Sequence, residues 1–290
     1  MLEAWANVIV SGLIIGGIYA VVAVGLNLQY GLMRILNVAH GEFLMVGAYL
    51  TFWGTTLIGT SPHLLMPAVF VVLAVTGFAL HAVLFRPLAR VAPNPEVFEA
   101  RGLIVSFGLM FIVQNAALLA WDADLRGGQG SLEAVRLGTL VVNGDKLLAC
   151  AIALAVGGAM ILWLRVTLVG KAVRALMQSP VGATLVGIDV RVLHPLVFGV
   201  GLGLAGLAGA LISTFYTISP SVGQPYTVTA LIVITLGGFG SVSGSLIGGV
   251  LLGVIEAVGV ELTSPSLKML LSYLVFVAVL IARPNGLFAR

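Results

Sequence analysis

Long apolar segments separated by short polar ones run through the whole chain. About 20 residues at a rise of 1.5 Å cross a hydrocarbon core of ~30 Å, and apolar runs near that length recur. The sequence therefore predicts an all-α polytopic membrane protein, with residues 1–290 forming one transmembrane domain of about eight to nine helices. The predicted spans are residues 5–27, 39–58, 64–85, 103–121, 147–164, 195–216, 226–239, 243–262 and 267–282.

The seventh segment, residues 226–239, is too short to cross comfortably and is predicted to be either a span or a re-entrant half-helix. A re-entrant helix is stable only where other helices bury it. The glycines of residues 236–249, LGGFGSVSGSLIGG, are too dense for a regular helix, so we expect a backbone break between two short helical pieces. Because broken helices at membrane depth commonly line a translocation path, Gly237, Gly238 and Gly240 are candidate path residues.

Composition supports the membrane class. The mean hydropathy is +1.14, and 60% of the residues are hydrophobic and 9% charged, whereas about a quarter of residues are charged in soluble domains. The single cysteine, Cys150, excludes an internal disulfide. No Lys or Arg precedes Arg34, so the first segment lacks the basic start of a cleaved signal peptide and is predicted to be a retained span.

The placement of basic residues predicts the orientation. With the N-terminus outside, ten basic residues face the cytoplasm: Arg34, Arg86, Arg90, Arg101, Arg165, Lys171, Arg174, Arg191, Arg283 and Arg290. Four face outward: Arg126, Arg136, Lys146 and Lys268. If residues 226–239 do not cross, the side predicted for the C-terminus changes.

Three polar stretches lie between the spans. The outer loop 121–146 is rich in glycine and is either a solvated connector or part of a docking face, and residues 86–101 read as a cytoplasmic linker. Segment 165–195 is a polar island. Within it, residues 170–178 and 181–189 are predicted to form two short helices, with Ser179 as an N-cap and a proline next at the first helical position.

Many of the 37 glycines lie inside predicted spans, where they permit close packing between helices. Four pairs have four-residue spacing: Gly12–Gly16, Gly199–Gly203, Gly244–Gly248 and Gly249–Gly253. The pairs favour tight packing within one bundle. Dimer contact, or helices that slide during transport, are the alternatives.

Polar residues also interrupt the apolar stretch from Gly25 to Leu50. They are Asn27, Gln29, Arg34, Asn37, His40 and Glu42. Because an ionisable side chain at the bilayer centre costs ~3 kcal/mol, this cluster indicates a helix end at the inner surface, a pore or mutual pairing. A helix-end position would place Glu42 at the positive end of a helix dipole. Asn37, His40 and Glu42 are therefore candidate path residues.

His40 and Glu42 are two residues apart and point in different directions on a helix. Neither a second His nor a Cys lies at ligand spacing, so we assign no catalytic residue and no metal site. Glu256 lies inside the span 243–262, where it either packs against polar groups or lines the path. It is also the one deep acid that an ion-coupled secondary transporter, the competing function, would use.

No stretch matches the P-loop pattern GxxxxGK[ST]. The Gly170-Lys171 pair is followed by Ala172 and lacks the upstream glycine. If transport is driven by ATP, a separate subunit must therefore bind ATP and Mg²⁺, and the chain itself is predicted to hold no cofactor and not to be an enzyme.

Three stretches carry a resemblance to a known family. They are NVAHGEFLMVGAY from Asn37, GKAVRALMQSPVGATLVGID from Gly170, and LGGFGSVSGSLIGGVLLGVIE from Leu236 with the closing RPNGLF. In this order, over essentially the whole chain, they resemble the permease subunits of bacterial ABC importers for branched-chain amino acids, the smaller of the two permeases above all. The resemblance implies a multi-pass protein of the bacterial inner membrane. Relatives in the same family resemble importers of urea, short amides or aromatic acids.

That resemblance also implies the partners: a second permease, identical or homologous, two cytoplasmic ATPase subunits and a periplasmic solute-binding protein. No nucleic acid is expected. Segment 170–189 corresponds to the family's ATPase-coupling element, and its recognisable positions are Gly170, Arg174, Ala175, Gly187, Ile188 and Asp189. Importers of this kind often carry Glu-Ala-Ala followed by Gly there, whereas this chain has Val181-Gly182-Ala183. The coupling role therefore depends on position and on the Gly-Ile-Asp end.

Overall fold

The computed structural model describes residues 2–128, 130, 132–137, 140–283 and 286–288. Its first helices are α1 (Leu2–Met33), α2 (His40–Ile58), α3 (Pro62–Leu80), the π-helical turn η1 (His81–Phe85), α4 (Arg86–Val91) and α5 (Pro95–Trp121). A hairpin of β1 (Ala134–Leu137) and β2 (Leu140–Asn143) follows. The remaining elements are α6 (Gly144–Val166), α7 (Leu168–Gln178), α8 (Pro180–Leu185), α9 (Val190–Ser213), α10 (Gly223–Gly237), α11 (Val242–Leu262), the 3₁₀ turn η2 (Pro265–Leu267) and α12 (Lys268–Ala282).

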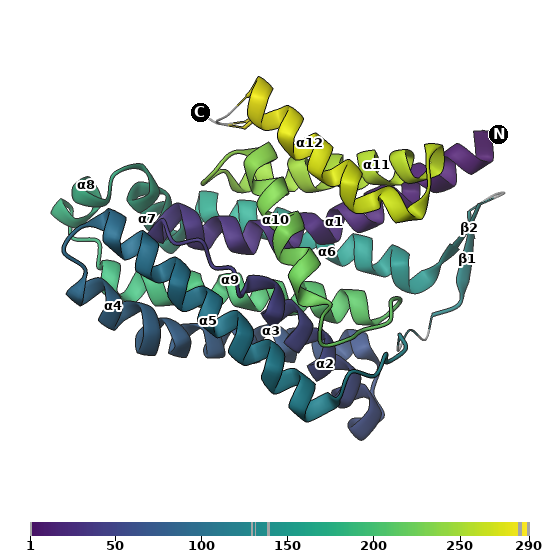
Figure 1. Cartoon of the computed structure of the whole chain (residues 1–290), viewed down its shortest axis with the longest axis horizontal. Helices are drawn as coiled ribbons and strands as arrows, with labels where there is room; N and C mark the ends of the chain where they lie inside the picture. Colours follow the sequence, from purple (N-terminus) through teal and green to yellow (C-terminus); the bar gives the residue numbers. More distant parts are fainter. Residues whose placement is uncertain (1, 129, 131, 138–139, 284–285, 289–290) are drawn as a thin grey trace.

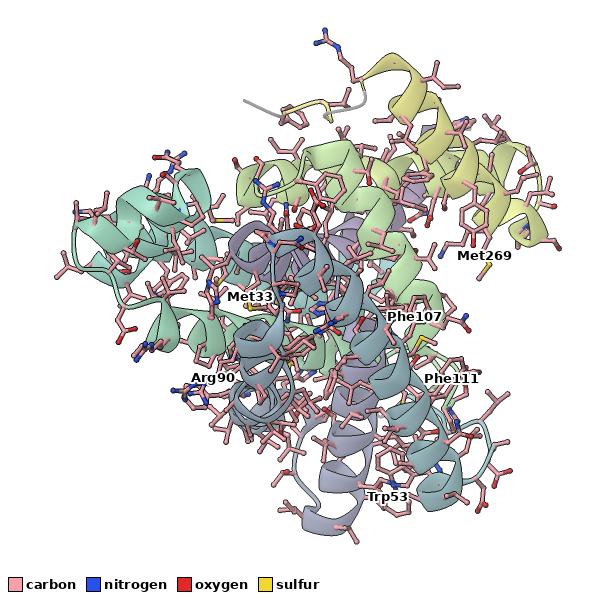
Figure 2. The ribbon with its side chains drawn as sticks, turned by 60° about the vertical axis from the view of Figure 1, so that its left-hand side comes forward. Met33, Trp53, Arg90, Phe107, Phe111 and Met269 are labelled. Carbon is pink, nitrogen blue, oxygen red and sulfur yellow. The ribbon has the colours of Figure 1, made fainter. Side chains whose placement is uncertain are left out.

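The bundle is organised around α1 and α9. In the most apolar 18-residue window of α9, 89% of residues are buried, against 6% for α12, so α9 is central and α12 peripheral. Large apolar side chains are exposed along α3, α5 and α12. Figure 2 shows two of them, Phe107 and Phe111, along one side of α5. Such surfaces suit contact with lipid or with another membrane subunit.

Helices α1 and α11 pack through glycines. A Cβ atom at Gly16 would lie 2.8 Å from Val250 Cα, and one at Gly12 would lie 2.8 Å from Val254 Cα. Both contacts are with backbone, so no side-chain rearrangement relieves them. The interpretation of these four-residue glycine pairs as tight packing inside one bundle is therefore confirmed for this crossing.

The two ends of the bundle differ in charge as the sequence predicts. Figure 1 shows α4, α7 and α8 at one end and the N-terminus with β1 and β2 at the other. Arg86, Arg90, Lys171 and Arg174 belong to the first end. Arg290, also predicted to face the cytoplasm, lies outside the described residues. The end that carries α7 and α8 is therefore the one predicted to face the cytoplasm.

One predicted loop has more regular structure than expected. Residues 86–101, predicted to be a linker, are mostly helical, because α4 continues η1 and α5 starts at Pro95. Asn94 caps α5 by accepting a hydrogen bond from the Val97 amide at 2.8 Å. Pro95 at the first helical position lacks an N–H that would have had no helical partner, so a proline here starts a helix instead of preventing one.

Among the described residues, seven helices are long and apolar enough to cross a membrane, against the eight to nine predicted. The predicted spans 39–58 and 226–239 correspond to α2 and α10, which are helical but do not meet that length and composition. Helix α10 has 15 residues, or ~22 Å, and is largely buried, as a re-entrant half-helix must be. These two helices position the candidate site.

Candidate functional site

The N-terminus of α2 lies deep inside the bundle. His40 Nε2 donates a hydrogen bond to the Val22 carbonyl oxygen at 3.1 Å. Val22 is eleven residues, or about 16 Å, before the end of α1 at Met33. Residues 34–39 are not helical, and six extended residues reach about 20 Å. The chain therefore turns back beside α1 before α2 begins.

The N-terminus of α10 reaches the same depth. The rings of Tyr226 and Tyr19 meet edge to face with centroids 6.1 Å apart, and Tyr19 lies near the middle of α1. The Gly41 amide donates to Thr227 Oγ1 at 2.8 Å, and the backbones of Gly41 and Gly223 touch. Two helix N-termini thus meet at mid-bundle. Their unpaired amides and dipoles make such ends favourable for negatively charged groups.

Of the three interpretations of the polar cluster, a helix end at the inner surface fits Glu42 only in part, because Glu42 lies in the first turn of α2 but not at a surface. Glu42 is fully buried, and neither carboxylate oxygen has a hydrogen-bond partner among the described residues. It lies beside Gly223, since a Cβ atom there would be 2.9 Å from Glu42 Oε2. Arg34 is exposed at the end of α1 and is the cluster member that the helix-end interpretation fits. Arg34 is exposed and Glu42 is buried because the chain between these two residues turns back into the bundle.

Asn37 anchors this re-entrant segment. Its Nδ2 donates to Gln29 Oε1 at 3.1 Å, and Gln29 Nε2 donates to the Phe198 carbonyl oxygen of α9 at 3.2 Å. The mutual-pairing interpretation therefore fits Asn37 and Gln29. Asn37 is fully buried, and its Oδ1 has no described partner.

The backbone break between α10 and α11 is shorter than predicted. It is confined to residues 238–241, where Gly238 and Gly240 have φ angles of 92° and 78°. The glycines of residues 242–249 are helical, contrary to the expectation that they prevent a regular helix. They serve as contact points instead: Gly244 packs on the backbone of Gly237 in α10.

Asn27 of α1 holds the break in place. Its Nδ2 lies within hydrogen-bonding distance of the carbonyl oxygens of Gly238 and Ser241, both at 3.1 Å, and of Ser245 Oγ at 2.6 Å. Its Oδ1 accepts from the Gly240 amide at 2.6 Å. Sequence reasoning noted Asn27 only as one polar residue in a span and assigned it no role. A lone Asn inside an apolar helix is the signal that could have found it.

Glu256 forms a cluster with α1 and α12. Tyr19 Oη donates to Glu256 Oε2 at 2.8 Å, Ser272 Oγ donates to Oε1, and Lys268 Nζ lies 3.6 Å from Oε2. The cluster lines a cavity of about 140 Å³, which also includes Tyr226. Glu256 therefore packs against polar groups of the bundle, and it also borders a cavity; whether it lines a path stays a prediction. The sequence assigned Lys268 only to the outer side, and Figure 2 shows its neighbour Met269 at the start of α12.

The candidate path residues thus fall at different depths. Gly240 lies against Gly31 near one end of α1, and Glu256 lies against Tyr19, twelve residues or ~18 Å away along that helix. The cavity at Glu256 and the meeting N-termini of α2 and α10 share Tyr226 and its neighbours. The break at residues 238–241 is a separate feature.

Segment 165–195 forms the two short helices that the sequence predicts. Thr167 caps α7 through the Gly170 amide at 2.9 Å, and Ser179 caps α8 through the Gly182 amide at 3.1 Å. Helix α7 is anchored by its buried apolar face, which includes Val173 and Leu176. The expected capping role of Ser179, with a proline next, is confirmed.

Helix α8 ends earlier than predicted, at Leu185. Gly187 has a φ of 86°, a left-handed conformation that favours glycine, and it turns the chain away from the helix. Asp189 then caps α9 by accepting from the Arg191 amide at 2.8 Å. Two of the predicted coupling residues, Gly187 and Asp189, therefore shape the turn after α8 and the start of α9, and Ala175 and Ile188 are half-buried.

The exposed surface of this element is mixed. Arg174 is exposed, and so are the apolar side chains of Val181, Leu185 and Val186 on and just after α8, Leu185 to 82%. Apolar side chains at the tip of a polar element are typical of a docking surface. Sequence reasoning did not assign these three residues.

The predicted outer loop, residues 121–146, is hydrogen-bonded to the segment that precedes α10. The backbones of Arg126 and Ile218 exchange two hydrogen bonds of 3.0 and 2.9 Å. His63 at the start of α3 pairs with Asp145 at 3.1 Å. The loop is therefore held by backbone hydrogen bonds to the segment before α10 and by an ion pair to α3. No group of three or more His, Cys, Asp or Glu side chains that could hold a metal is present within the described ranges.

Comparison with known proteins places the chain in a family. Residues 8–280 match the family model described as "Branched-chain amino acid transport system / permease component". The high-affinity branched-chain amino acid transport system permease protein BraD of Pseudomonas aeruginosa is 30% identical, covering 97% of this chain and 95% of BraD. LivH of Escherichia coli, with the same description, is 28% identical over 97% of this chain and 94% of its own length.

A solved structure shares the fold. The chain matches one in PsaBC from Streptococcus pneumoniae in complex with Fab, with a TM-score of 0.51 and 14% identity, over 97% of this chain and 92% of that one. At this identity the match supports the arrangement of helices alone. By its sequence, over nearly its whole length, the chain belongs to the family of permease components of branched-chain amino acid transport systems.

Proposed function

We propose that the chain is the membrane-spanning permease subunit of an ATP-driven importer of branched-chain amino acids in the bacterial inner membrane. It works with a second permease subunit, two cytoplasmic ATPase subunits and a periplasmic solute-binding protein. The whole chain is one transmembrane domain, with segment 165–195 as the coupling element and loop 121–146 on the outer side. Chemistry on ATP takes place in the partner subunits.

The element α7–α8 is the observation that carries this proposal. It is a pair of short helices at the end of the bundle predicted to face the cytoplasm, anchored through Val173 and Leu176 and exposing Arg174 and Leu185. A short amphipathic helix of this kind can seat in a groove on a partner. Because Gly170 packs directly on the Leu164 backbone at the end of α6, movement of the seated element would be transmitted to the spans.

The substrate path in this proposal runs past the N-terminus of α10 and the cavity beside Glu256. Lys268 Nζ has donors beyond its contact with Glu256, and the helix N-terminus also favours negative charge, so a substrate carboxylate has two binding groups there. The apolar side chains of Ile232 and Met269 complete the cavity wall. A zwitterion with an apolar side chain fits this combination better than uncharged urea or a short amide.

The residue roles follow from these positions. In the proposal, Gly170, Ala175, Gly187, Ile188 and Asp189 shape the coupling element, and Arg174 contacts the ATPase. Glu42 and Glu256 border the path, while Asn37, His40, Gly237, Gly238 and Gly240 hold the re-entrant segments that form it.

Reconstitution with the partner subunits tests the proposal. In proteoliposomes loaded with ATP, uptake of labelled leucine should depend on the liganded binding protein and should stop when the P-loop lysine of the ATPase is replaced. Uptake that persists with the altered ATPase under a proton gradient alone would show an ion-coupled secondary transporter instead.

A further inference from the structure

A second pocket lies beside the coupling element and shares no lining residue with the cavity beside Glu256. Its volume is about 190 Å³, and it is bordered by the end of α1, the start of α5, and α7 to α9. Its floor is apolar and includes Met33, Phe98 and Leu176. In Figure 2, Met33 lies between α5 and the two helices of the coupling element.

Two opposite charges stand at this pocket, Arg34 and Glu99. Both side chains are exposed, and among the described residues neither has an oppositely charged partner within 4 Å. Arg34 has a φ of 56°, a left-handed conformation uncommon for a residue other than glycine. This conformation is the left-handed cap that ends α1, in which the Arg34 amide donates to the Tyr30 carbonyl oxygen at 2.8 Å.

The size and charges define one class of ligand. A cavity of ~150 Å³ accommodates benzene, and sites for drug-sized molecules begin near ~300 Å³, so the pocket suits a molecule of fewer than about a dozen heavy atoms. An arginine favours a carboxylate, a glutamate favours an ammonium group, and the apolar floor favours an aliphatic or aromatic side chain. A free amino acid with an apolar side chain has all three groups.

We propose that this pocket is an inhibitory site at which the imported amino acid, once accumulated in the cytoplasm, binds and slows further import. Leu176 belongs to α7 and Val190 begins α9, whereas Met33 and Phe98 belong to α1 and α5. A bound ligand would join the coupling element to the bundle and stabilise the arrangement described here. A ligand that prefers one state of a cycle slows every step that leaves that state.

This inference rests on the proposed function, and direct binding separates the two. The purified permease–ATPase complex, without binding protein, is tested for binding of labelled leucine. Competing probes are 4-methylpentanoate, which lacks the ammonium group, 3-methylbutylamine, which lacks the carboxylate, and glycine, which lacks the apolar side chain. We expect leucine to compete at least tenfold better than any of them. Loss of one charge-assisted contact costs about that factor, and so does loss of the burial of a leucine side chain.

Variants assign the binding to this pocket. Glu99→Gln and Arg34→Gln should each weaken leucine binding about tenfold or more, whereas Glu96→Gln, one turn earlier on α5 and outside the pocket lining, should leave it unchanged. In proteoliposomes, leucine enclosed with ATP should slow import several-fold for the unaltered chain and for Glu96→Gln, but not for Glu99→Gln.

The outcomes are distinguishable. If leucine is not imported but binds the complex, and this binding is lost in Glu99→Gln, the proposed function is refuted and the assignment of the pocket is supported. If leucine is imported but enclosed leucine has no effect, or acts equally on Glu99→Gln and Glu96→Gln, the inhibitory site is refuted and the proposed function stands.

Discussion

Replacement of Asn27 by alanine tests whether one side chain holds the break between α10 and α11. Asn27 reaches two carbonyl oxygens at 3.1 Å, Ser245 Oγ at 2.6 Å and the Gly240 amide at 2.6 Å. Polar contacts between membrane helices average ~0.6 kcal/mol each and reach ~1.7. Leaving the Gly240 amide without a partner adds ~1 kcal/mol, the low end for a partly buried group. Because Nδ2 carries two hydrogens, at most three of the four contacts are hydrogen bonds at one time, so the free energy of unfolding should fall by about 2–3 kcal/mol.

The measurement is unfolding in mixed detergent micelles with increasing sodium dodecyl sulfate, followed by tryptophan fluorescence and circular dichroism. Asn115→Ala is the matched control, because Asn115 is in a membrane helix but bonds only to the Phe111 carbonyl oxygen of its own α5, at 2.7 Å. This control should change the free energy of unfolding by less than ~0.5 kcal/mol, as exposed substitutions do. Equal effects of the two substitutions would refute the role given to Asn27.

Further substitutions test packing, coupling and the path. Gly16→Val places a side chain against the backbone of α11, so it should lower the free energy of unfolding by several kcal/mol in the same titration. The control Gly158→Ala, which has open space around it, should be neutral or slightly stabilising. Arg174→Glu or Leu185→Asp should abolish co-purification with the ATPase or its stimulation by the binding protein, with membrane insertion unchanged; normal stimulation would contradict docking through α7–α8. Lys268→Gln should lower leucine uptake about tenfold in an assembled complex, and undiminished uptake would remove the cavity from the path.

Local features were predictable from the chain because they depend on neighbouring residues. The length of the apolar runs predicts the long helices. Ser179 followed by proline marks the start of α8, because a cap is set within a few residues. The end of α8 was predicted too late, since the left-handed turn at Gly187 was not foreseen. Four-residue glycine spacing likewise indicated close helix packing, which the contact of Gly16 with α11 confirms.

The sequence did not correctly predict the depth of α2 or the burial of Glu42, because the chain turns back into the bundle there. Residues 39–58 have the length of a span, yet α2 begins beside Val22 in the middle of α1. Glu42 looked like an interfacial acid, and its burial follows only from the depth of that start. The depth of a segment in the bundle depends on which helices surround it. Hydropathy averaged along the chain carries no information on that depth.

The sequence by itself determined the membrane class, the helical content, the charged end of the bundle and the short helix pair, because each depends on composition or on neighbouring residues. Only the tertiary structure decided that Asn27 holds a break more than 200 residues away, that Glu256 pairs with Lys268 and Tyr19, and that Arg34 and Glu99 share a pocket. These groups meet through the packing of helices distant in sequence. A polar residue inside a predicted span indicates that its side chain is paired. Only the packing of the helices determines which residue is its partner.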